Sequence, residues 1–146
     1  MFDELETRVM GLDFGMKRIG IALSDSLKMF AYTYKTILNN HVTFNELKDL
    51  INEKKIIEIV LGIPNEERAS KTSIVKEVQK FKTQLETKFV LKVILWDETY
   101  TSAIAQQRIL ESVTKKNKRK NKDLLDMHSA AIILQEYLDS LKLNNN

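Results

Sequence analysis

Apolar residues in the first part of the chain fall in short runs that predict β-strands. Arg8–Phe14 and Arg18–Ser24 are two such runs, and Gly15-Met16-Lys17 between them has the composition of a tight turn. We therefore expect these two runs to pair as a hairpin. The aromatic and β-branched run Phe30–Ile37 predicts a third strand.

The rest of the chain alternates between helical periodicity and continuous apolar runs. Helices are predicted where apolar side chains recur every three or four residues, at 43–55, 68–86, 101–111 and 123–141. The runs 56–63 and 89–96 are almost uninterrupted, which is typical of strands covered on both faces. Together these elements predict an α/β fold, with a five-stranded mixed sheet flanked by helices on both faces.

Two helix starts carry capping signals. Thr43-Phe44-Asn45-Glu46 has the spacing of a capping box, which makes Thr43 the expected cap of its helix. Asp123 is the expected cap of the last helix. The apolar residues of that helix form one continuous stripe, made of Met127, Ala130, Ala131, Leu134, Tyr137, Leu138 and Leu141.

The length and composition of the chain limit the number of domains and the kinds of catalytic or metal site that it can form. A chain of 146 residues suits one domain, and we expect a core over 8–140, a flexible basic loop at 113–122 and a disordered tail at 143–146. With no cysteine and two histidines, thiol catalysis and a multi-histidine zinc site are excluded. A metal held by this chain would be a hard cation bound by carboxylates.

No segment of the sequence suggests a membrane or an export signal. Every apolar run is far shorter than the ~18 residues that a spanning helix needs. The first eight residues carry Asp3, Glu4 and Glu6, so they lack the basic and apolar regions of a signal peptide. We expect a cytoplasmic protein.

Acids stand at three places where the pattern predicts burial or the end of a strand. Asp13 interrupts the first apolar run, and the pair Asp97-Glu98 follows the strand predicted at 89–96. Asp126 lies four residues before Ala130, on the apolar stripe of the last helix. Ligand sites of α/β sheets gather at the carboxyl ends of strands, so the acids at these three places are candidates for one shared site.

Each of these acids also has a purely structural interpretation. Asp13 would brace the turn that follows it. Asp97 and Glu98 would stabilise the positive end of the next helix, and since neighbouring strand residues point to opposite faces, only one of the two is expected in a shared site. Asp126, three residues after Asp123, would bond back to the helix cap.

If the three acids meet, their mutual repulsion would raise their pKa values. A divalent cation, Mg²⁺ or Mn²⁺, would remove that repulsion and also bind a substrate phosphate. Two such ions about 3.5–4 Å apart activate water and stabilise the leaving oxygen when a phosphodiester is cleaved. The residues therefore suggest a two-metal endonuclease, in which Asp13, Asp126 and one of the pair Asp97-Glu98 are both catalytic and metal-binding.

Basic residues are concentrated in one stretch, although the net charge is only +3. Six of the eight residues from 115 to 122 are Lys or Arg, which is the composition of a phosphate-binding loop. A solvated loop is the alternative. A second set of cations, at the predicted start of helix 68–86, would favour anions too. The candidate substrate-binding residues from these two segments are Arg68, Lys71, Lys115, Lys116, Lys118, Arg119 and Lys120.

Four motifs in order resemble the YqgF family, also called RuvX. Residues 9–22, which read VMGLDFGMKRIGIA, resemble the opening motif of that family. Three further segments resemble the later motifs of the family. They are Leu61-Gly62-Ile63-Pro64, Asp97-Glu98-Thr99-Tyr100-Thr101-Ser102 with Ala105, and Asp126 with the segment 130–135. The resemblance covers about residues 8–140.

The resemblance implies an RNase H-like fold related to Holliday-junction resolvases. It also implies a cytoplasmic nuclease linked to maturation of the 5′ end of pre-16S rRNA, in which the acids matching Asp13, Glu98 and Asp126 bind metal. The family usually has Arg where this chain has Thr99, so Lys17, Arg18 or Arg108 would have to hold phosphate instead. The segment 65–69 also lacks the family's Asp-Gly pair.

Other functions remain open at the level of sequence. The expected partner is nucleic acid, with precursor rRNA or a small-subunit ribosomal precursor favoured and a DNA junction as the alternative. A resolvase would be a homodimer, because a four-way junction has two-fold symmetry, whereas an RNA nuclease could be a monomer. A non-catalytic RNA-binding or ribosome-binding module is the third hypothesis. A sugar-kinase-like phosphotransferase would need two such domains, and this chain has room for one.

Overall fold

The computed structural model describes residues 6–64, 72–98 and 118–144. Their elements are, in chain order, β1 (Arg8–Phe14), β2 (Arg18–Ser24), β3 (Ala31–Leu38), α1 (Thr43–Lys54), β4 (Ile56–Ile63), α2 (Thr72–Phe89), β5 (Lys92–Asp97) and α4 (Lys118–Asn144). The strands form one sheet in the order β3-β2-β1-β4-β5. Since β1 pairs antiparallel with β2 and parallel with β4, the sheet is mixed, as predicted.

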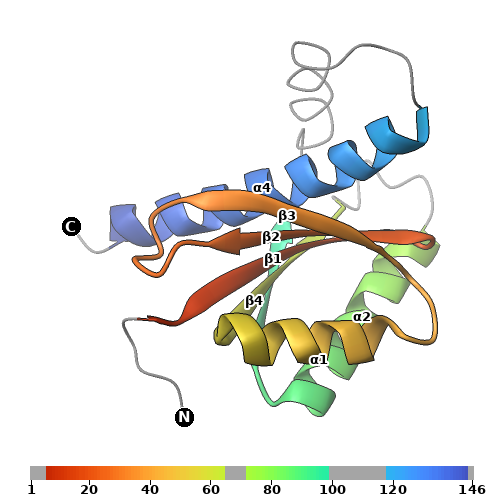
Figure 1. The fold of residues 1–146 in the computed structure, drawn as a ribbon, viewed down its shortest axis with the longest axis horizontal. Helices are drawn as coiled ribbons and strands as arrows, with labels where there is room; N and C mark the ends of the chain where they lie inside the picture. The colour runs from red at the N-terminus through yellow and green to blue at the C-terminus, as the bar shows by residue number, and fades with distance from the viewer. Residues whose placement is uncertain (1–5, 65–71, 99–117, 145–146) are drawn as a thin grey trace.

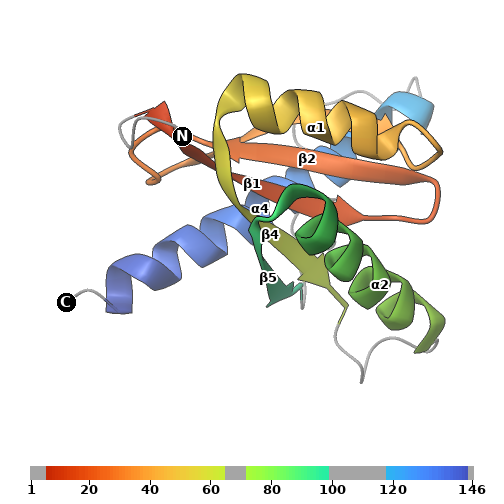
Figure 2. The ribbon, with the colours of Figure 1, turned by 90° about the horizontal axis from the view of Figure 1, so that it is seen from below.

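Helices cover both faces of this sheet (Figure 1). Figure 2 shows α1 and α2 on one face and α4 crossing the other. Side chains alternate between the faces along each strand. In β1, Met10 and Leu12 therefore point toward α1 and α2, whereas Val9 and Gly11 point toward α4.

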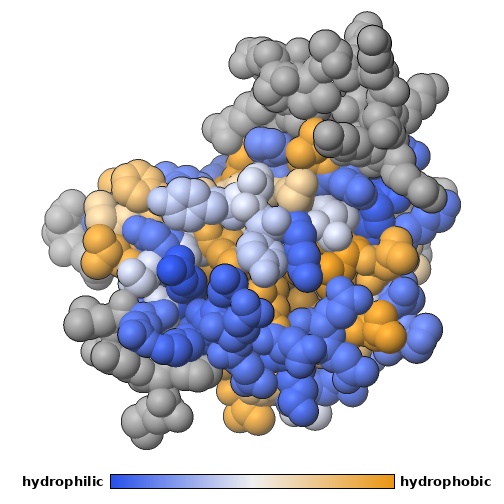
Figure 3. All heavy atoms as spheres, in the orientation of Figure 1, coloured by the Kyte–Doolittle hydropathy of each residue, from blue (hydrophilic) through white to orange (hydrophobic). Residues whose placement is uncertain are grey.

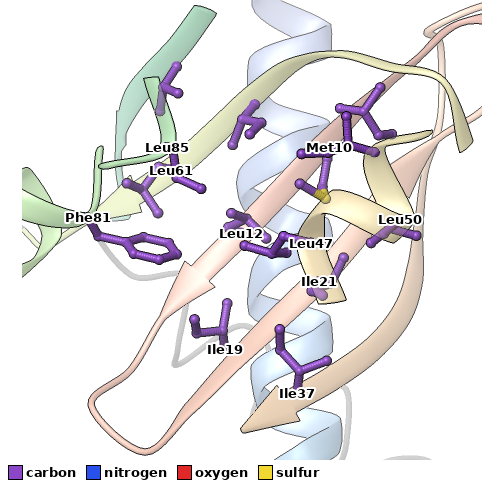
Figure 4. Packing of buried hydrophobic residues seen from close by; sticks show 14 of the residues in the cluster. Met10, Leu12, Ile19, Ile21, Ile37, Leu47, Leu50, Leu61, Phe81 and Leu85 are labelled. Atoms are coloured by element: carbon purple, nitrogen blue, oxygen red, sulfur yellow. The ribbon is translucent and has the colours of Figure 1, made fainter. Parts of the chain in front are cut away.

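The larger apolar cluster lies between the sheet and α1 and α2 (Figure 4). Full burial of each such side chain stabilises the fold by about 1.5–3 kcal/mol. The outer surface over α1 is hydrophilic, as the lower part of Figure 3 shows. The cluster includes Met10, Leu12, Ile19, Ile21, Ile37, Leu47, Leu50, Leu61, Phe81 and Leu85.

The first helix begins as predicted but is not capped as predicted. Thr43 is the first helical residue, and the cap position is Val42, which makes no side-chain cap hydrogen bond. The Thr43 hydroxyl instead donates to the carbonyl oxygen of Leu38 at 2.9 Å. The capping-box prediction was therefore wrong, because the buried threonine bonds to the end of β3 rather than to its own helix.

The prediction of a strand starting at Phe89 was also wrong. Phe89 is the last residue of α2, and its ring lies 6.3 Å from the ring of Phe44. The left-handed backbone of Val90 (φ 52°) follows that helix, and β5 begins at Lys92. Packing of Phe89 against α1 has outweighed its preference for a strand.

The last helix is longer at both ends than the sequence pattern suggested. Residues 118–122, expected in a flexible loop, belong to α4, and so do 143 and 144 of the expected tail. Lys and Arg are good helix formers, so a basic stretch continues a helix readily. Asp123 is consequently inside the helix and does not cap it. No helix in the described ranges is long and apolar enough to cross a membrane.

Candidate active site

Two carboxyl groups meet at the end of the parallel strands. Asp13 is the next-to-last residue of β1, and Glu98 directly follows β5, where its backbone N–H donates to the carbonyl oxygen of Ile63 at 3.1 Å. Because β1, β4 and β5 run parallel, their carboxyl ends share one edge. The side chains of Asp13 and Glu98 are hydrogen-bonded to each other.

The electrostatics of this pair follow from burial and like charge. Burial raises the pKa of Asp13 well above its usual range, and the neighbouring charge of Glu98 raises it further. Burial also raises the pKa of Glu98, while the hydrogen bond from Asp13 opposes that rise. The surroundings of this pair thus disfavour two negative charges side by side.

Asp126 comes to the same region from α4. Its negative charge adds to the effects of burial and of Glu98 in raising the pKa of Asp13, so Asp13 lies within electrostatic reach of both other acids predicted from the sequence. Burial raises the pKa of Asp126 itself, and its contact with Arg18 counteracts this. The Nε of Arg18 donates to Asp126 Oδ2 at 3.0 Å and lies 3.7 Å from Asp123 Oδ1.

Two glycines allow α4 and Glu98 to pack closely against the strands at the site. A side chain at Gly20 would collide with the backbone carbonyl of Asp126, so α4 can lie against β2 only because this position has no Cβ. At Gly62 in β4, a Cβ would stand 2.8 Å from Glu98 Oε2 and would overlap Ile133 of α4. The close approach of backbone and helix thus positions both Asp126 and Glu98.

The three acids do not form one tight cluster. Within residues 6–64, 72–98 and 118–144, no three His, Cys, Asp or Glu side chains are close enough together to hold a single ion as they stand. The structure instead shows the Asp13–Glu98 pair, with Asp126 beside it and held by Arg18. This ion pair was not anticipated from the sequence. The glycines of the strands that face α4, Gly11, Gly20 and Gly62, are the sequence signal of this close helix contact.

The remaining predicted residues are distributed as follows. Lys17 is exposed in the β1–β2 turn, and Arg18 begins β2. Asp97 is the last residue of β5. Burial raises the pKa of Glu136 in α4, and the negative charge of Asp97 raises it further. Lys118, Arg119 and Lys120 are in the first turns of α4. The other candidates, Arg68, Lys71, Arg108, Lys115 and Lys116, lie outside the described residues, as do Thr99 and the helix expected at 101–111.

Comparison with solved structures defines the class of fold. The structure superposes on T. thermophilus RuvC in complex with a Holliday junction substrate, with a TM-score of 0.57 and 8% sequence identity, covering 93% of this chain and 96% of that one. It also resembles the fowlpox virus resolvase in complex with junction DNA, with a TM-score of 0.53, 14% identity, and coverage of 92% and 98%. The fold is therefore the RNase H-like fold of these resolvases, as the sequence motifs implied.

Sequence comparison is more specific. The family model described as "RuvX: Holliday junction resolvase" matches residues 7–140. A protein of Sulfurihydrogenibium sp. named "Putative pre-16S rRNA nuclease" is 36% identical over 95% of this chain and 94% of its own length. One of the same name from Clostridioides difficile is 36% identical, over 97% and 99%. The chain belongs to the RuvX family.

Proposed function

We propose that this protein is a nuclease that hydrolyses phosphodiester bonds with the help of divalent cations bound by Asp13, Glu98 and Asp126. The observation that supports this most directly is the hydrogen-bonded pair of half-buried carboxyl groups at the end of β1 and β5. Two acids with raised pKa values beside each other are unfavourable for stability and are typical of functional sites.

The donor set fits a hard cation. Carboxylate oxygens are the ligands that Mg²⁺ and Mn²⁺ prefer, and the like charges of Asp13 and Glu98 leave a position that either a proton or a cation would fill. Asp126 would complete the set once it leaves Arg18. Bound there, one or two such ions would supply an activated water and would neutralise charge on the leaving oxygen.

The chain's own residues have separate tasks in this proposal. Asp13 and Glu98 hold a proton between them until a cation replaces it. Arg18 holds Asp126 through its 3.0 Å hydrogen bond and competes with a cation for that carboxylate. Once Asp126 turns to the cation, the guanidinium of Arg18 is free to bind a substrate phosphate, the task that the family's Arg at position 99 would otherwise perform.

The proposed substrate is the precursor of 16S rRNA, acted on in the cytoplasm near its 5′ end. The names of relatives that are 36% identical over nearly the whole chain support this choice. A Holliday junction is the second candidate, favoured by the family description and by the likeness to RuvC.

A cleavage assay with one substitution tests the mechanism. Asp13→Asn keeps the size of the side chain but removes its charge, and we expect it to lower the cleavage rate of a precursor 16S RNA fragment more than about 100-fold in Mg²⁺ or Mn²⁺. Asp49→Asn on the exposed side of α1 is the matched control and should cleave normally. Undiminished cleavage by Asp13→Asn would refute the mechanism. Cleavage of a four-way DNA junction but not of the RNA would favour the second candidate.

A further inference from the structure

A groove of about 750 Å³ opens beside the carboxylates, on the β3 side of Asp126. This volume lies within the range of about 300–1,000 Å³ that is usual for ligand sites. The groove runs between the start of β2, the end of β3 and the start of α4. It is lined by Lys17, Arg18, Thr36, Ile37, Leu38, Lys122 and Asp123.

The charges in the groove are only partly neutralised. Arg18 is engaged by Asp126 and Asp123. Lys17 and Lys122 are both exposed, and neither ammonium group pairs with a carboxylate in the part of the chain that the structure describes. Two uncompensated cations facing one groove attract an anionic ligand, and they stand next to the acids proposed to cleave phosphodiesters.

The walls of the groove are fixed before any ligand binds. Asn39 clamps the β1–β2 turn, with its backbone N–H donating to Lys17 O at 2.9 Å and its side-chain amide donating to Gly15 O at 2.8 Å. The Thr36 hydroxyl donates to the backbone carbonyl of Asp123 at 2.7 Å, which ties β3 to α4. A preformed groove loses little conformational entropy when it binds.

One wall of the groove is apolar. Leu38, at the end of β3, is 62% exposed, and Ile37 precedes it. In a double helix the apolar faces of the bases are stacked on one another and would not reach this wall. A single strand, whose sugars and unpaired bases present apolar faces while its phosphates meet lysines, would cover both parts of the groove.

We propose that this groove binds a single-stranded segment of the nucleic acid substrate, immediately next to the bond that is cut. The inference rests on the proposed nuclease function and adds to it the path of the strand. Lys17 and Lys122 contact successive phosphates, and Leu38 contacts an unpaired base or its sugar. Arg18 lies between the groove and Asp126, so the strand passes from the groove to the carboxylates.

Binding without cleavage tests the groove separately from catalysis. The probe is a short fluorescein-labelled oligouridylate, measured by anisotropy in the Asp13→Asn background. The double substitution Lys17→Gln with Lys122→Gln should weaken binding about tenfold or more. It should also reduce the slope of log K against log salt by about 1.4, because each lost phosphate contact on a single strand removes about 0.7. Lys48→Gln, at an exposed position of α1 and outside the groove, is the control.

Leu38→Ser tests the single-strand part of the proposal. It should weaken binding of the oligouridylate severalfold and leave binding of a blunt RNA duplex unchanged. Equal oligouridylate affinities of the lysine double variant and the Lys48→Gln control would overturn the proposal that the groove binds nucleic acid. Equal losses for single-stranded and duplex RNA in Leu38→Ser would overturn the single-strand assignment. Failure of the wild-type protein to cleave RNA would count against the nuclease function alone, since these measurements need no cleavage.

Discussion

The two faces of the sheet are built by the same strands and differ sharply in what they contain. Toward α1 and α2, the strands present large side chains such as Leu12 and Ile21, both fully buried. Toward α4, the corresponding positions are Gly11, Gly20 and Asp13. Both faces bury apolar side chains, and the smaller cluster toward α4 includes Val9, Val60 and Leu134. The α4 face differs because it also carries close backbone approach and charge.

This difference shows how the fold accommodates an unfavourable group of acids. Small residues let α4 lie near the backbone of β1 and β2, which brings Asp126 within electrostatic reach of Asp13. The repulsion and burial of these carboxyl groups destabilise the fold. The apolar cluster on the other face, centred on residues such as Leu47 and Leu61, offsets that cost.

The largest stability effect should come from the apolar face. Leu47→Ala in α1 removes a fully buried side chain and should lower the free energy of unfolding by about 2–5 kcal/mol. In the folded protein, Mn²⁺ affinity should stay within about twofold of wild type, because the two faces are separated by the sheet. Urea unfolding and calorimetric titration with Mn²⁺ measure the two quantities. A large loss of Mn²⁺ affinity would show that the faces are coupled.

A single methyl group on the other face should affect both quantities. In Gly20→Ala, the new Cβ meets the carbonyl of Asp126, so α4 must shift. We expect a loss of about 1–3 kcal/mol in stability and about a tenfold loss of Mn²⁺ affinity. Thr33→Ala, at an exposed position of β3, serves as the control. Normal Mn²⁺ affinity in Gly20→Ala would mean that the position of α4 does not set the cation site.

The acids themselves should make stability depend on pH in a defined direction. The pKa of Asp13 is raised in the folded protein, so its contribution is fully present below the unfolded value of 3.8 and is lost as pH rises through the raised folded value. Glu98, also with a raised pKa, acts in the same direction. In EDTA, Asp13→Asn should therefore be more stable than wild type at neutral pH, by about 1 kcal/mol, and the difference should shrink toward acid pH.

Urea titrations of both proteins across this pH range, with and without Mg²⁺, measure the effect. Mg²⁺ should stabilise the wild type more than Asp13→Asn, because a ligand of the folded state adds stability in proportion to its binding. A wild-type protein that gains stability as pH rises from acid to neutral, relative to Asp13→Asn, would contradict the assignment of the raised pKa.

The smallest expected effect concerns Arg18. Arg18→Gln removes the partner of Asp126, a partly exposed ion pair of the kind worth at most about 1 kcal/mol. Without nucleic acid, Mn²⁺ affinity should therefore rise by about two- to fivefold, whereas oligouridylate binding should weaken. Calorimetric titration measures the expected rise in Mn²⁺ affinity, and anisotropy measures the expected loss of oligouridylate binding. A fall in Mn²⁺ affinity would indicate that Arg18 helps to assemble the site rather than competing for Asp126.

Local sequence patterns were sufficient to predict the bounds of three strands but not where α4 and β5 begin. The bounds of β1, β2 and β4 match the apolar runs, because a strand buried on both faces needs an uninterrupted run of apolar side chains. The starts of α4 and β5 did not follow the patterns. Contacts made by Phe89 with a distant helix and the helix-forming tendency of the lysines decided those boundaries. The packing of Phe89 leaves no local signal, whereas the helix-forming tendency of the lysines is itself local.

The sequence by itself determined the order of the elements, the mixed sheet and the three acids as candidates. The pattern of apolar and polar residues and the positions of charged residues are local properties that can be read directly from the chain. Tertiary structure alone decided that Asp13 shares a hydrogen bond with Glu98 and that Asp126 is held by Arg18, 108 residues away in the chain. It also created the groove between β2, β3 and α4. Such contacts depend on how closely two backbones approach, and the glycines that permit this approach can be understood only once the helix is seen against the sheet.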